Sequence, residues 1–581
     1  MRIPLRQYYA LLVGYLRPQS QRVLLLAALL FGNIGLQLLS PQILRHFIDT
    51  ARAGGAPRVL AAAAALFMGA ALVNQVVAVA ATYTSENVAW TATNALRAHL
   101  AEHCLRLDMS FHKGHTPGEM IERLDGDVTA LATFFSQFVL RVLGSLVLLA
   151  GVLVLLWRED WRPGLAMTLF TVLALGALLR IRSIAVPHWA AARQARADAA
   201  GFLEERLAGT EDIRSSGAVP HVLRQFYHLL RQVLLRERRA ALMNAAVGLT
   251  MLSMFGAGTA LALGLGGALY RAGAITLGTV YLIFRYSEML FRPLNMLTNQ
   301  MQDLQKASAG IERINELYRT QAVIRDGQGA RLPTGALSAE FRHVSFAYDG
   351  DERVLHDLSF RLLPGRVLGL LGRTGSGKTT LTRLLARLYE PDTGAILLGG
   401  TDIRDVRLAE LRQRVAMVTQ DVQLFRATLR DNLTFFDRGI ADQRILAVLD
   451  ELGLADWYRA LPRGLDTELE SGGSGLSAGE GQLLAFARVF LRDPGIVILD
   501  EASSRLDSAT EQLVERAVAR LLRGRTGIIV AHRLATVLRA DEIMIVEHGR
   551  IREHGPRELL AGDPGSHFAT LLRVGLEEAL A

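Results

Sequence analysis

A glycine-rich run at residues 372–379 has the composition and spacing of a phosphate-binding loop. It reads G-R-T-G-S-G-K-T and matches the pattern G-x-x-x-x-G-K-[ST] at every position. An apolar stretch at 367–371 precedes the run and a helical pattern at 380–389 follows it, which is the strand–loop–helix context that such a loop requires. Glycines let backbone N–H groups wrap phosphate oxygens, and the helix N-terminus adds a positive dipole. We therefore expect a nucleotide to bind at Gly372, Arg373, Thr374, Gly375, Ser376, Gly377, Lys378, Thr379 and Thr380.

Two carboxylates follow a second apolar stretch. Residues 496–499 read I-V-I-L, and Asp500 and Glu501 come directly after them. Ligands of open α/β sheets gather beyond the carboxyl ends of strands, so these acids are expected near the phosphate loop. Asp500 and Thr379 are suited to hold Mg²⁺, and Glu501 is suited to act as the general base on an attacking water. The pattern predicts hydrolysis of a nucleoside triphosphate.

The choice of basic residue supports the assignment of the loop. Of the 64 basic residues only Lys113, Lys306 and Lys378 are lysines, and the other 61 are arginines. The chain thus uses arginine almost wherever a cation is needed. A compact ammonium serves a phosphate loop better than a planar guanidinium does, which fits the retention of lysine at position 378.

The chain divides into an apolar first half and a more polar second half, and these motifs lie in the second. The 581 residues are 50% hydrophobic with a mean hydropathy of +0.24 and a single cysteine, Cys104. That composition excludes intrinsic disorder and a disulfide-rich secreted class. The first half carries six apolar runs of about 16–25 residues, near the ~20 that cross a bilayer as a helix. We predict six membrane spans at 23–40, 59–81, 138–157, 163–179, 245–269 and 275–290.

The distribution of charge indicates orientation in a membrane. The net charge is +8, but residues 1–337 hold 33 basic and 21 acidic residues, whereas the remainder holds 31 and 35. Because the positive excess lies in the apolar half, it favours membrane orientation over nucleic-acid binding. Arginines precede the first span, and eleven more lie between residues 180 and 239. We expect a multi-pass plasma-membrane protein with both termini and the ATPase part in the cytoplasm, although Arg45, Arg52 and Arg58 run against this rule.

A further motif supplies a resemblance to a known family. Residues 476–482 read L-S-A-G-E-G-Q, and a helical run and the carboxylate strand follow them. This order resembles the signature motif of ATP-binding cassette (ABC) proteins, and the whole chain resembles an ABC exporter half-transporter. The resemblance implies an α-helical transmembrane bundle followed by an α/β P-loop NTPase domain, with ATP and Mg²⁺ as cofactors. The expected divisions are a transmembrane domain at 1–325, a linker at 326–337 and a nucleotide-binding domain at 338–581.

The resemblance also implies roles for single residues. Tyr348 resembles the aromatic that stacks on adenine, and Gln420 the loop glutamine that senses Mg²⁺. His532 resembles the switch histidine at the γ-phosphate, which makes it catalytic together with Lys378 and Glu501. Breaks at 109–115 and 211–217 resemble short coupling helices, and residues 504–507 the loop that crosses to the partner cassette. The signature would meet the nucleotide of the partner through Ser477, Ala478, Gly479 and Glu480.

The signature departs from the family pattern, which usually reads L-S-G-G-Q. Ala478 replaces a glycine and Glu480 replaces the glutamine. An acid there would face a polyanion, which is unfavourable unless the side chain turns away. Paired half-transporters of the family often combine one competent and one impaired site. We therefore expect a heterodimer with a second half-transporter, and a homodimer is the alternative.

Two charges in the sixth predicted span are candidates for a substrate cavity. Arg285 and Glu288 are three residues apart and so share a helix face. Intramembrane charges are costly and usually line a cavity or pair with each other, and both alternatives remain open here. Asn33, Gln37, Asn74 and Gln75 are weaker candidates.

The resemblance implies ATP-driven export or flipping of a small amphipathic molecule, a lipid or a peptide. The alternatives are a homodimeric lipid flippase or multidrug exporter and, further off, an ATP-gated channel with the same motifs. The six apolar runs argue against a soluble cassette regulator.

Overall fold

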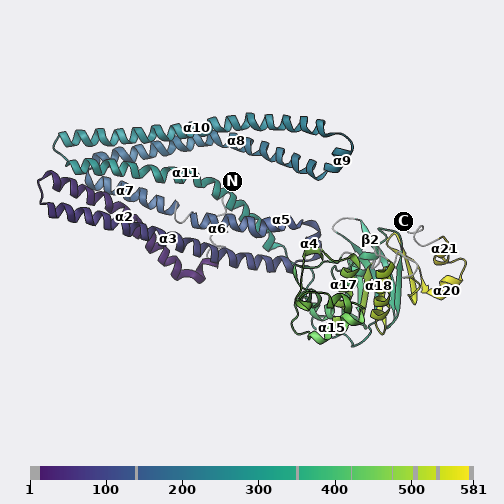
Figure 1. Ribbon diagram of the computed structural model, residues 1–581. Helices are drawn as coiled ribbons and strands as arrows, with labels where there is room; N and C mark the ends of the chain where they lie inside the picture. The colour runs from purple at the N-terminus through teal and green to yellow at the C-terminus, as the bar shows by residue number, and fades with distance from the viewer. Residues whose placement is uncertain are drawn as a thin grey trace. The chain divides into compact units, whose positions relative to one another are not determined.

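The computed structural model describes residues 14–137, 142–348, 352–419, 422–473, 475–500, 508–530 and 537–574. It contains two compact units (Figure 1). The helical unit comprises Met1–Leu105 and Pro117–Thr320, and the nucleotide-binding unit comprises Arg106–Thr116 and Gln321–Ala581. The nucleotide-binding unit therefore includes a short segment from far earlier in the chain.

The helical unit is built from long helices that run side by side. Its helices are α2 (Ser20–Arg52), α3 (Pro57–Arg106), α5 (Pro117–Ile121), α6 (Val128–Gln137), α7 (Gly144–Glu159), α8 (Trp161–Ala208), α9 (Thr210–Ser215), α10 (Val219–Arg271) and α11 (Leu277–Arg319). The 50 residues of α3 correspond to about 75 Å at 1.5 Å per residue, far more than a bilayer core of about 30 Å. Helices α3, α8 and α10, of 50, 48 and 53 residues, therefore extend well beyond the length of a membrane span.

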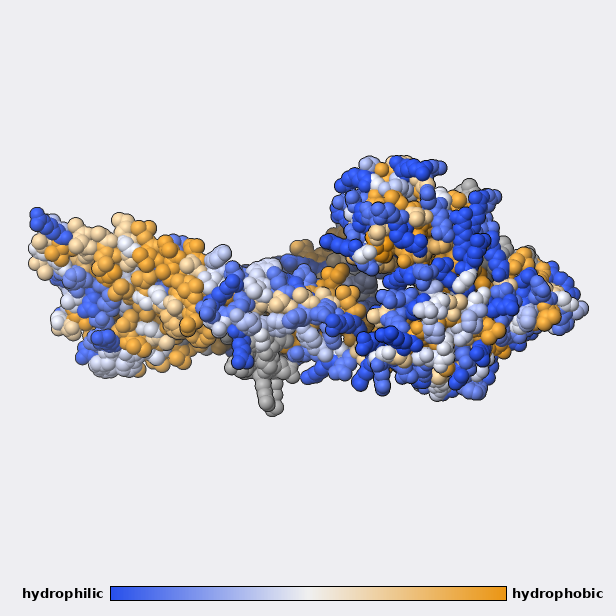
Figure 2. Space-filling model, turned by 90° about the horizontal axis from the view of Figure 1, so that it is seen from below, coloured by the Kyte–Doolittle hydropathy of each residue, from blue (hydrophilic) through white to orange (hydrophobic). Residues whose placement is uncertain are grey.

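Each of the six predicted spans overlaps a helix of the described chain. Within the described residues, four helices are long and apolar enough to cross a membrane, namely Gly14–Arg52, Pro57–Arg106, Trp161–Ala208 and Val219–Arg271. The third and sixth runs correspond to α7, before which residues 138–141 lie outside the description, and α11. Hydrophobic residues gather along one stretch of the bundle and give way to hydrophilic ones farther along it (Figure 2). Leu24, Leu72 and Leu252 expose 73%, 66% and 67% of their surface there, as expected of side chains that face lipid.

Two of the three arginines that run against the orientation rule, Arg45 and Arg52, have identified partners. Arg45 is paired with Glu159 of the neighbouring α7 at 2.6 Å and lies 3.8 Å from Asp49. The Arg52 guanidinium lies 4.9 Å from the centroid of the Tyr270 ring. These contacts lie where short connections join α2 to α3, α7 to α8 and α10 to α11. The charge of Arg45 is therefore compensated by carboxylates, whereas Arg52 is placed over a neutral ring.

The nucleotide-binding unit contains two main sheets. The antiparallel sheet has the order β2-β1-β4-β5 and consists of β1 (Ala339–Ala347), β2 (Arg353–Leu362), β4 (Thr393–Leu398) and β5 (Thr401–Asp402). The second sheet has the order β12-β11-β3-β10-β9-β6. Its strands are β3 (Val367–Leu371), β6 (Val415–Val418), β9 (Ile496–Asp500), β10 (Thr526–Val530), β11 (Glu542–Glu547) and β12 (Arg550–Pro556). Adjacent strands of this sheet are parallel, except that β11 and β12 pair antiparallel.

The smaller elements of this unit lie around the sheets. The short strands β7 (Ala427–Thr428) and β8 (Glu468–Leu469) pair with each other. The helices are α4 (Met109–Gly114), α12 (Lys378–Leu385), α13 (Leu408–Arg414), α14 (Leu429–Thr434), α15 (Asp442–Glu451), α16 (Ala455–Arg459), α17 (Ala478–Arg492), α18 (Ser508–Leu522), α20 (Arg557–Gly562) and α21 (His567–Val574).

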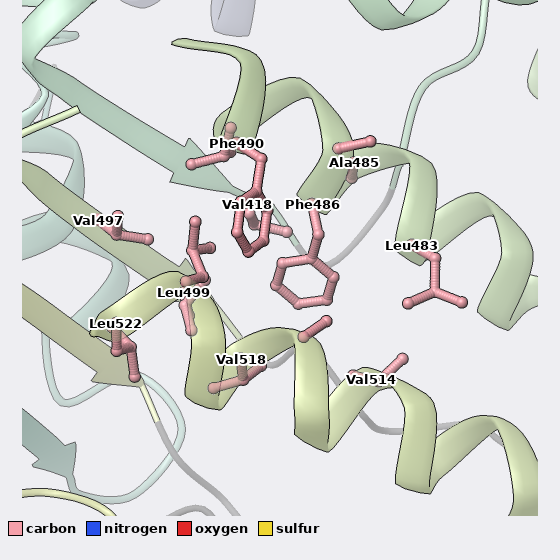
Figure 3. Close-up of a cluster of buried hydrophobic side chains, with 14 of the residues drawn as sticks. Val418, Leu483, Ala485, Phe486, Phe490, Val497, Leu499, Val514, Val518 and Leu522 are labelled. Carbon is pink, nitrogen blue, oxygen red and sulfur yellow. The ribbon is translucent and has the colours of Figure 1, made fainter. Parts of the chain in front are cut away.

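A dense apolar core holds this unit together. Phe486 of α17 points between the two helices α17 and α18 and is fully buried (Figure 3). It belongs to the same cluster as Val518 of α18 and Leu499 of β9. Burying a phenylalanine side chain contributes about 1.5–3 kcal/mol relative to leaving it exposed. The core thus fixes the positions of α17 and β9, which carry two of the predicted motifs.

Candidate functional site

The phosphate-binding loop joins β3 to α12, as the sequence predicts. Gly372, Gly375 and Gly377 have φ values of 146°, 82° and 106°, which side chains other than glycine rarely adopt. A Cβ atom at Gly372 would overlap the carbonyl oxygen of Val546, and one at Gly377 would overlap the Leu355 side chain. The glycines are therefore required both by backbone conformation and by the close approach of neighbouring strands.

The loop has the polar groups that a phosphate chain needs. Lys378 is 6% exposed, and its Nζ donates to the carbonyl oxygens of Gly372 at 2.5 Å and Arg373 at 3.0 Å. The Ser376 hydroxyl is buried and has no hydrogen-bond partner. A buried hydroxyl without a partner is costly, and a phosphate oxygen would satisfy it. These observations fit a nucleotide phosphate at the N-terminus of α12.

The sheet brings together the ends of the strands that precede the other predicted residues in the sequence. Strands β3, β10, β9 and β6 are neighbours and parallel, so their carboxyl ends meet. Asp500 ends β9, opposite Val530 at the end of β10. Gln420, Glu501 and His532, together with 504–507, lie outside the described residues, directly after β6, β9 and β10.

Tyr348 follows β1 and is half-buried beside α12. Its hydroxyl lies 3.1 Å from the Thr380 hydroxyl in the first turn of α12. The rings of Phe346 and Tyr389 stand nearly perpendicular to it, with centroids at 4.9 and 5.2 Å. The aromatic that the sequence assigns to adenine is thus held in one orientation next to the phosphate loop.

The signature residues form the start of α17, and Glu480 turns back toward the backbone. Ser477 is the N-cap, and its hydroxyl accepts from the Glu480 backbone N–H at 3.2 Å. The Glu480 carboxylate accepts from the Ser477 backbone N–H at 2.7 Å, which completes a capping box. In this chain the Glu480 carboxylate is therefore engaged by the backbone of its own helix N-terminus.

Arg488 is a residue of interest that sequence reasoning missed. Its guanidinium donates to the backbone oxygens of Gln423 at 2.9 Å and Asn432 at 2.8 Å and lies 4.6 Å from the Phe435 ring centroid. Burial lowers its pKa to about 10, so the group stays charged at neutral pH. Arg488 ties the signature helix to the segment that begins just after Gln420. An arginine inside the apolar run of α17 was the signal that could have found it.

Short helices, α4 and α9, lie at the two breaks for which the sequence predicts coupling helices. The first lies in the segment Arg106–Thr116, which groups with the nucleotide-binding unit, whereas α9 groups with the helical unit. Phe111 stacks on His115, with 4.2 Å between the ring centroids. This contact places the Phe111 ring in local packing within its own segment.

A cavity of about 640 Å³ opens within the helical unit. It gathers the polar side chains that the sequence singled out within apolar helices, together with aromatic ones. The Arg285 and Glu288 side chains form an ion pair and are 45% and 26% exposed. Among the residues that the structure describes, the Oδ1 atoms of Asn33 and Asn74 are buried without a hydrogen-bond partner. The lining includes Asn33, Gln37, Asn74, Gln75, Phe67, Phe255, Tyr281, Arg285 and Glu288.

Comparisons with known proteins agree with this architecture. The model of the ABC transporter transmembrane region matches residues 23–294, and the ABC transporter model matches residues 355–504. A multidrug resistance ABC transporter ATP-binding and permease protein of Lactococcus lactis subsp. cremoris is 31% identical, over 92% of this chain and 90% of the relative. An ATP-dependent lipid A-core flippase of Ralstonia nicotianae is 31% identical, over 96% and 95%.

A solved structure extends the likeness to the whole fold. A bacterial Atm1-family ABC exporter with ATP bound superposes with a TM-score of 0.75 at 26% identity, and the match covers 97% of both chains. The matched parts include the helical region, the ATP-binding unit and their order along the chain. The chain therefore belongs to the ABC transporter family, as a membrane-embedded exporter that carries its transmembrane region and the ATPase that drives transport on one polypeptide.

Proposed function

We propose that this exporter moves a small amphipathic molecule, lipid or peptide across the plasma membrane, with both termini and the ATPase part in the cytoplasm. The observation that carries the substrate class is the cavity of the helical unit. Its ion pair and its two unpaired amide oxygens offer charge and hydrogen bonds to a polar head group. Phe67, Phe255 and Tyr281 offer apolar surface to a tail. The related flippase and multidrug transporter support this class.

At the ATP site, this chain's own residues bind and orient the nucleotide. The backbone of the phosphate loop and Lys378 hold the phosphates, and Tyr348 stacks on adenine. Glu501 accepts a proton from the attacking water, and His532 contacts the γ-phosphate. Thr379, Gln420 and Asp500 would hold Mg²⁺, which supplies charge neutralisation on the phosphates.

The transporter acts as a dimer in this proposal, and each of two assemblies has support. The altered signature, with Ala478 and Glu480, favours pairing with a different half-transporter. The capping box favours a homodimer, because it directs the Glu480 carboxylate to the Ser477 backbone and away from a facing phosphate. Co-expression of two differently tagged copies separates the assemblies. An ATPase-active complex that contains both tags and no other chain establishes the homodimer.

Alanine substitutions at the ion pair, with an exchange of the two charges as the control, test the role of the cavity in substrate binding. Arg285→Ala and Glu288→Ala should each abolish the stimulation of ATPase activity by an amphipathic substrate and leave the basal rate intact. The matched control is the exchange Arg285→Glu with Glu288→Arg, which keeps an ion pair but reverses its direction. Restored stimulation in the exchange variant would reduce the pair to a structural role. Uptake against a gradient into inside-out vesicles distinguishes an exporter from an ATP-gated channel.

A further inference from the structure

Helix α4 is held to the nucleotide-binding unit by contacts from far along the chain. The Asp108 carboxylate, at the N-cap of α4, accepts hydrogen bonds from the backbone N–H groups of Val323 and Ile324. The segment Arg106–Thr116 accordingly groups with this unit, although the rest of the chain around it belongs to the helical unit. Because α4 follows α3 directly in the chain, a change in the contacts of α4 acts on the end of α3.

Lys113 of α4 makes a second contact, with the ring of Tyr348, the residue proposed to stack on adenine. Its Nζ lies 4.0 Å from the centroid of the Tyr348 ring, within the range of a cation–π interaction. Lys113 itself is exposed, whereas Tyr348 is half-buried. Because Tyr348 packs on the apolar core beside Phe346 and Tyr389, its accessible surface is limited. An exposed ammonium over such a ring covers the surface that a stacking base would need.

We propose that the Lys113 ammonium and the adenine base of ATP compete for the same face of Tyr348, so that ATP binding releases one tie between α4 and the nucleotide-binding unit. The inference rests on the proposed role of Tyr348 as the adenine-stacking residue. By thermodynamic linkage the effect is reciprocal, because whatever holds α4 in place weakens ATP binding by the same factor. Lys113 is thus a positioning residue that makes the adenine site sensitive to the position of α4.

The size of the effect follows from the strength of the contact. A cation–π interaction at an exposed site corresponds to about a two- to fivefold change in an equilibrium constant. The identity of the cation matters too, since a guanidinium lies flat on an aromatic face and is more weakly hydrated than an ammonium. Lysine at position 113, in a chain with 61 arginines, therefore gives a contact that adenine can displace more readily.

Binding measurements on the full-length transporter in lipid nanodiscs test the competition. With Glu501→Gln present throughout to prevent turnover, Lys113→Gln should lower the Kd for ATP about two- to fivefold. Lys113→Arg should leave the Kd unchanged or raise it. Lys306→Gln removes the same charge elsewhere in the chain and should have no effect. An unchanged or higher Kd in Lys113→Gln would overturn the proposal.

A double-mutant cycle separates this inference from the assignment of Tyr348. Tyr348→Leu should weaken ATP binding by itself and should abolish the effect of Lys113→Gln. If Tyr348→Leu leaves the Kd for ATP unchanged, the adenine assignment fails and the inference fails with it. If Tyr348→Leu weakens ATP binding but Lys113→Gln does not strengthen it when Tyr348 is present, only the competition is wrong.

The scarcity of lysine permits a direct observation of the contact. Incorporation of [ε-¹³C]lysine labels only Lys113, Lys306 and Lys378, and the Lys113 signal is identified by its loss in Lys113→Arg. A position over the Tyr348 ring shifts this signal upfield through the ring current. Addition of ATP to the Glu501→Gln transporter should move it toward the value of a solvated lysine. A signal that ATP leaves in place would contradict the competition.

Discussion

The two units place their polar groups in opposite ways. In the nucleotide-binding unit the functional groups follow the ends of neighbouring strands, and Lys378 is satisfied by the backbone of its own loop. In the helical unit the polar groups of the cavity come from the three helices α2, α3 and α11, and two amide oxygens have no hydrogen-bond partner among the described residues. The first arrangement builds a site from short contiguous motifs. The second builds one from single residues that only the packing of helices brings together.

The largest expected effect on activity is at Glu501, the proposed general base of the ATP site. Glu501→Gln should lower steady-state ATP turnover at least about 100-fold, because a general base contributes about 10²–10⁴-fold. The Kd for ATP should stay within a factor of two or so, since the change removes no phosphate contact. Phosphate release and nucleotide binding measure the two quantities. Glu515→Gln, on α18, is the matched control, and near-normal turnover in Glu501→Gln would refute the assignment.

A core substitution tests whether the two units are independent in stability. Phe486→Ala should destabilise the nucleotide-binding unit by about 3–5 kcal/mol through lost burial and a cavity. Hydrogen exchange on the full chain should show loss of protection in β9 and β10, with α8 and α10 unchanged. Phe436→Ala, at a side chain that is 55% exposed, is the control. Equal loss of protection in the long helices would show that the units unfold together.

Removal of the unpaired amides should separate stability from transport. Asn33→Leu and Asn74→Leu eliminate buried oxygens without partners, so each should leave stability unchanged or raise it by about 1 kcal/mol. Each should also weaken stimulation of the ATPase by substrate about tenfold, the value of a hydrogen bond of about 1.4 kcal/mol. Thermal unfolding and dose–response curves provide the readouts, with Thr250→Val on α10 as the control. A loss of stability without a change in stimulation would assign these residues to helix packing.

The smallest effect is expected at the start of α17. Glu480→Ala breaks the capping box and should cost about 0.5–2 kcal/mol, whereas Glu480→Gln keeps an acceptor for the Ser477 backbone and should cost less. Both are measured as shifts in thermal unfolding beside ATPase rates. A several-fold rise in ATPase rate in Glu480→Gln would mean that the acid does face a phosphate, which restores the argument for a heterodimer.

The nucleotide-binding unit could be read from the sequence where a motif and its strand are contiguous. The runs before Gly372 and Asp500 form β3 and β9, and the phosphate loop joins β3 to a helix as expected. The sequence does not predict the antiparallel sheet, because apolar and polar residues alternate only weakly in strands such as β2. The direction of Glu480 was open as well, since an acid at the third position of a helix can serve either a cap or a ligand.

Long-range contacts account for what the sequence left undetermined. The charge pair Arg285 and Glu288 was visible as an oddity within an apolar run, but its assembly with Asn33 and Asn74 depends on helix packing. The contact between Lys113 and Tyr348 joins positions that no local pattern connects. Arg488 likewise acquires its partners only once α17 packs beside α14. Pattern and period specify elements, whereas these pairs depend on tertiary structure.

The pairing of Arg45 with Glu159 has a consequence for the biogenesis of this protein. Glu159 is synthesised 114 residues after Arg45, so the newly made first hairpin must insert before this partner exists. In the proposed orientation Arg45 opposes translocation of the segment around it during that interval, with only Asp49, 3.8 Å away on the same helix, to offset its charge, and the arginines at 2, 6, 17 and 22 must outweigh it. Later emergence of α7 then neutralises the charge and locks the first hairpin to the second. Arg45 thus hinders insertion before Glu159 is synthesised, and the ion pair of the two residues stabilises the inserted bundle afterwards.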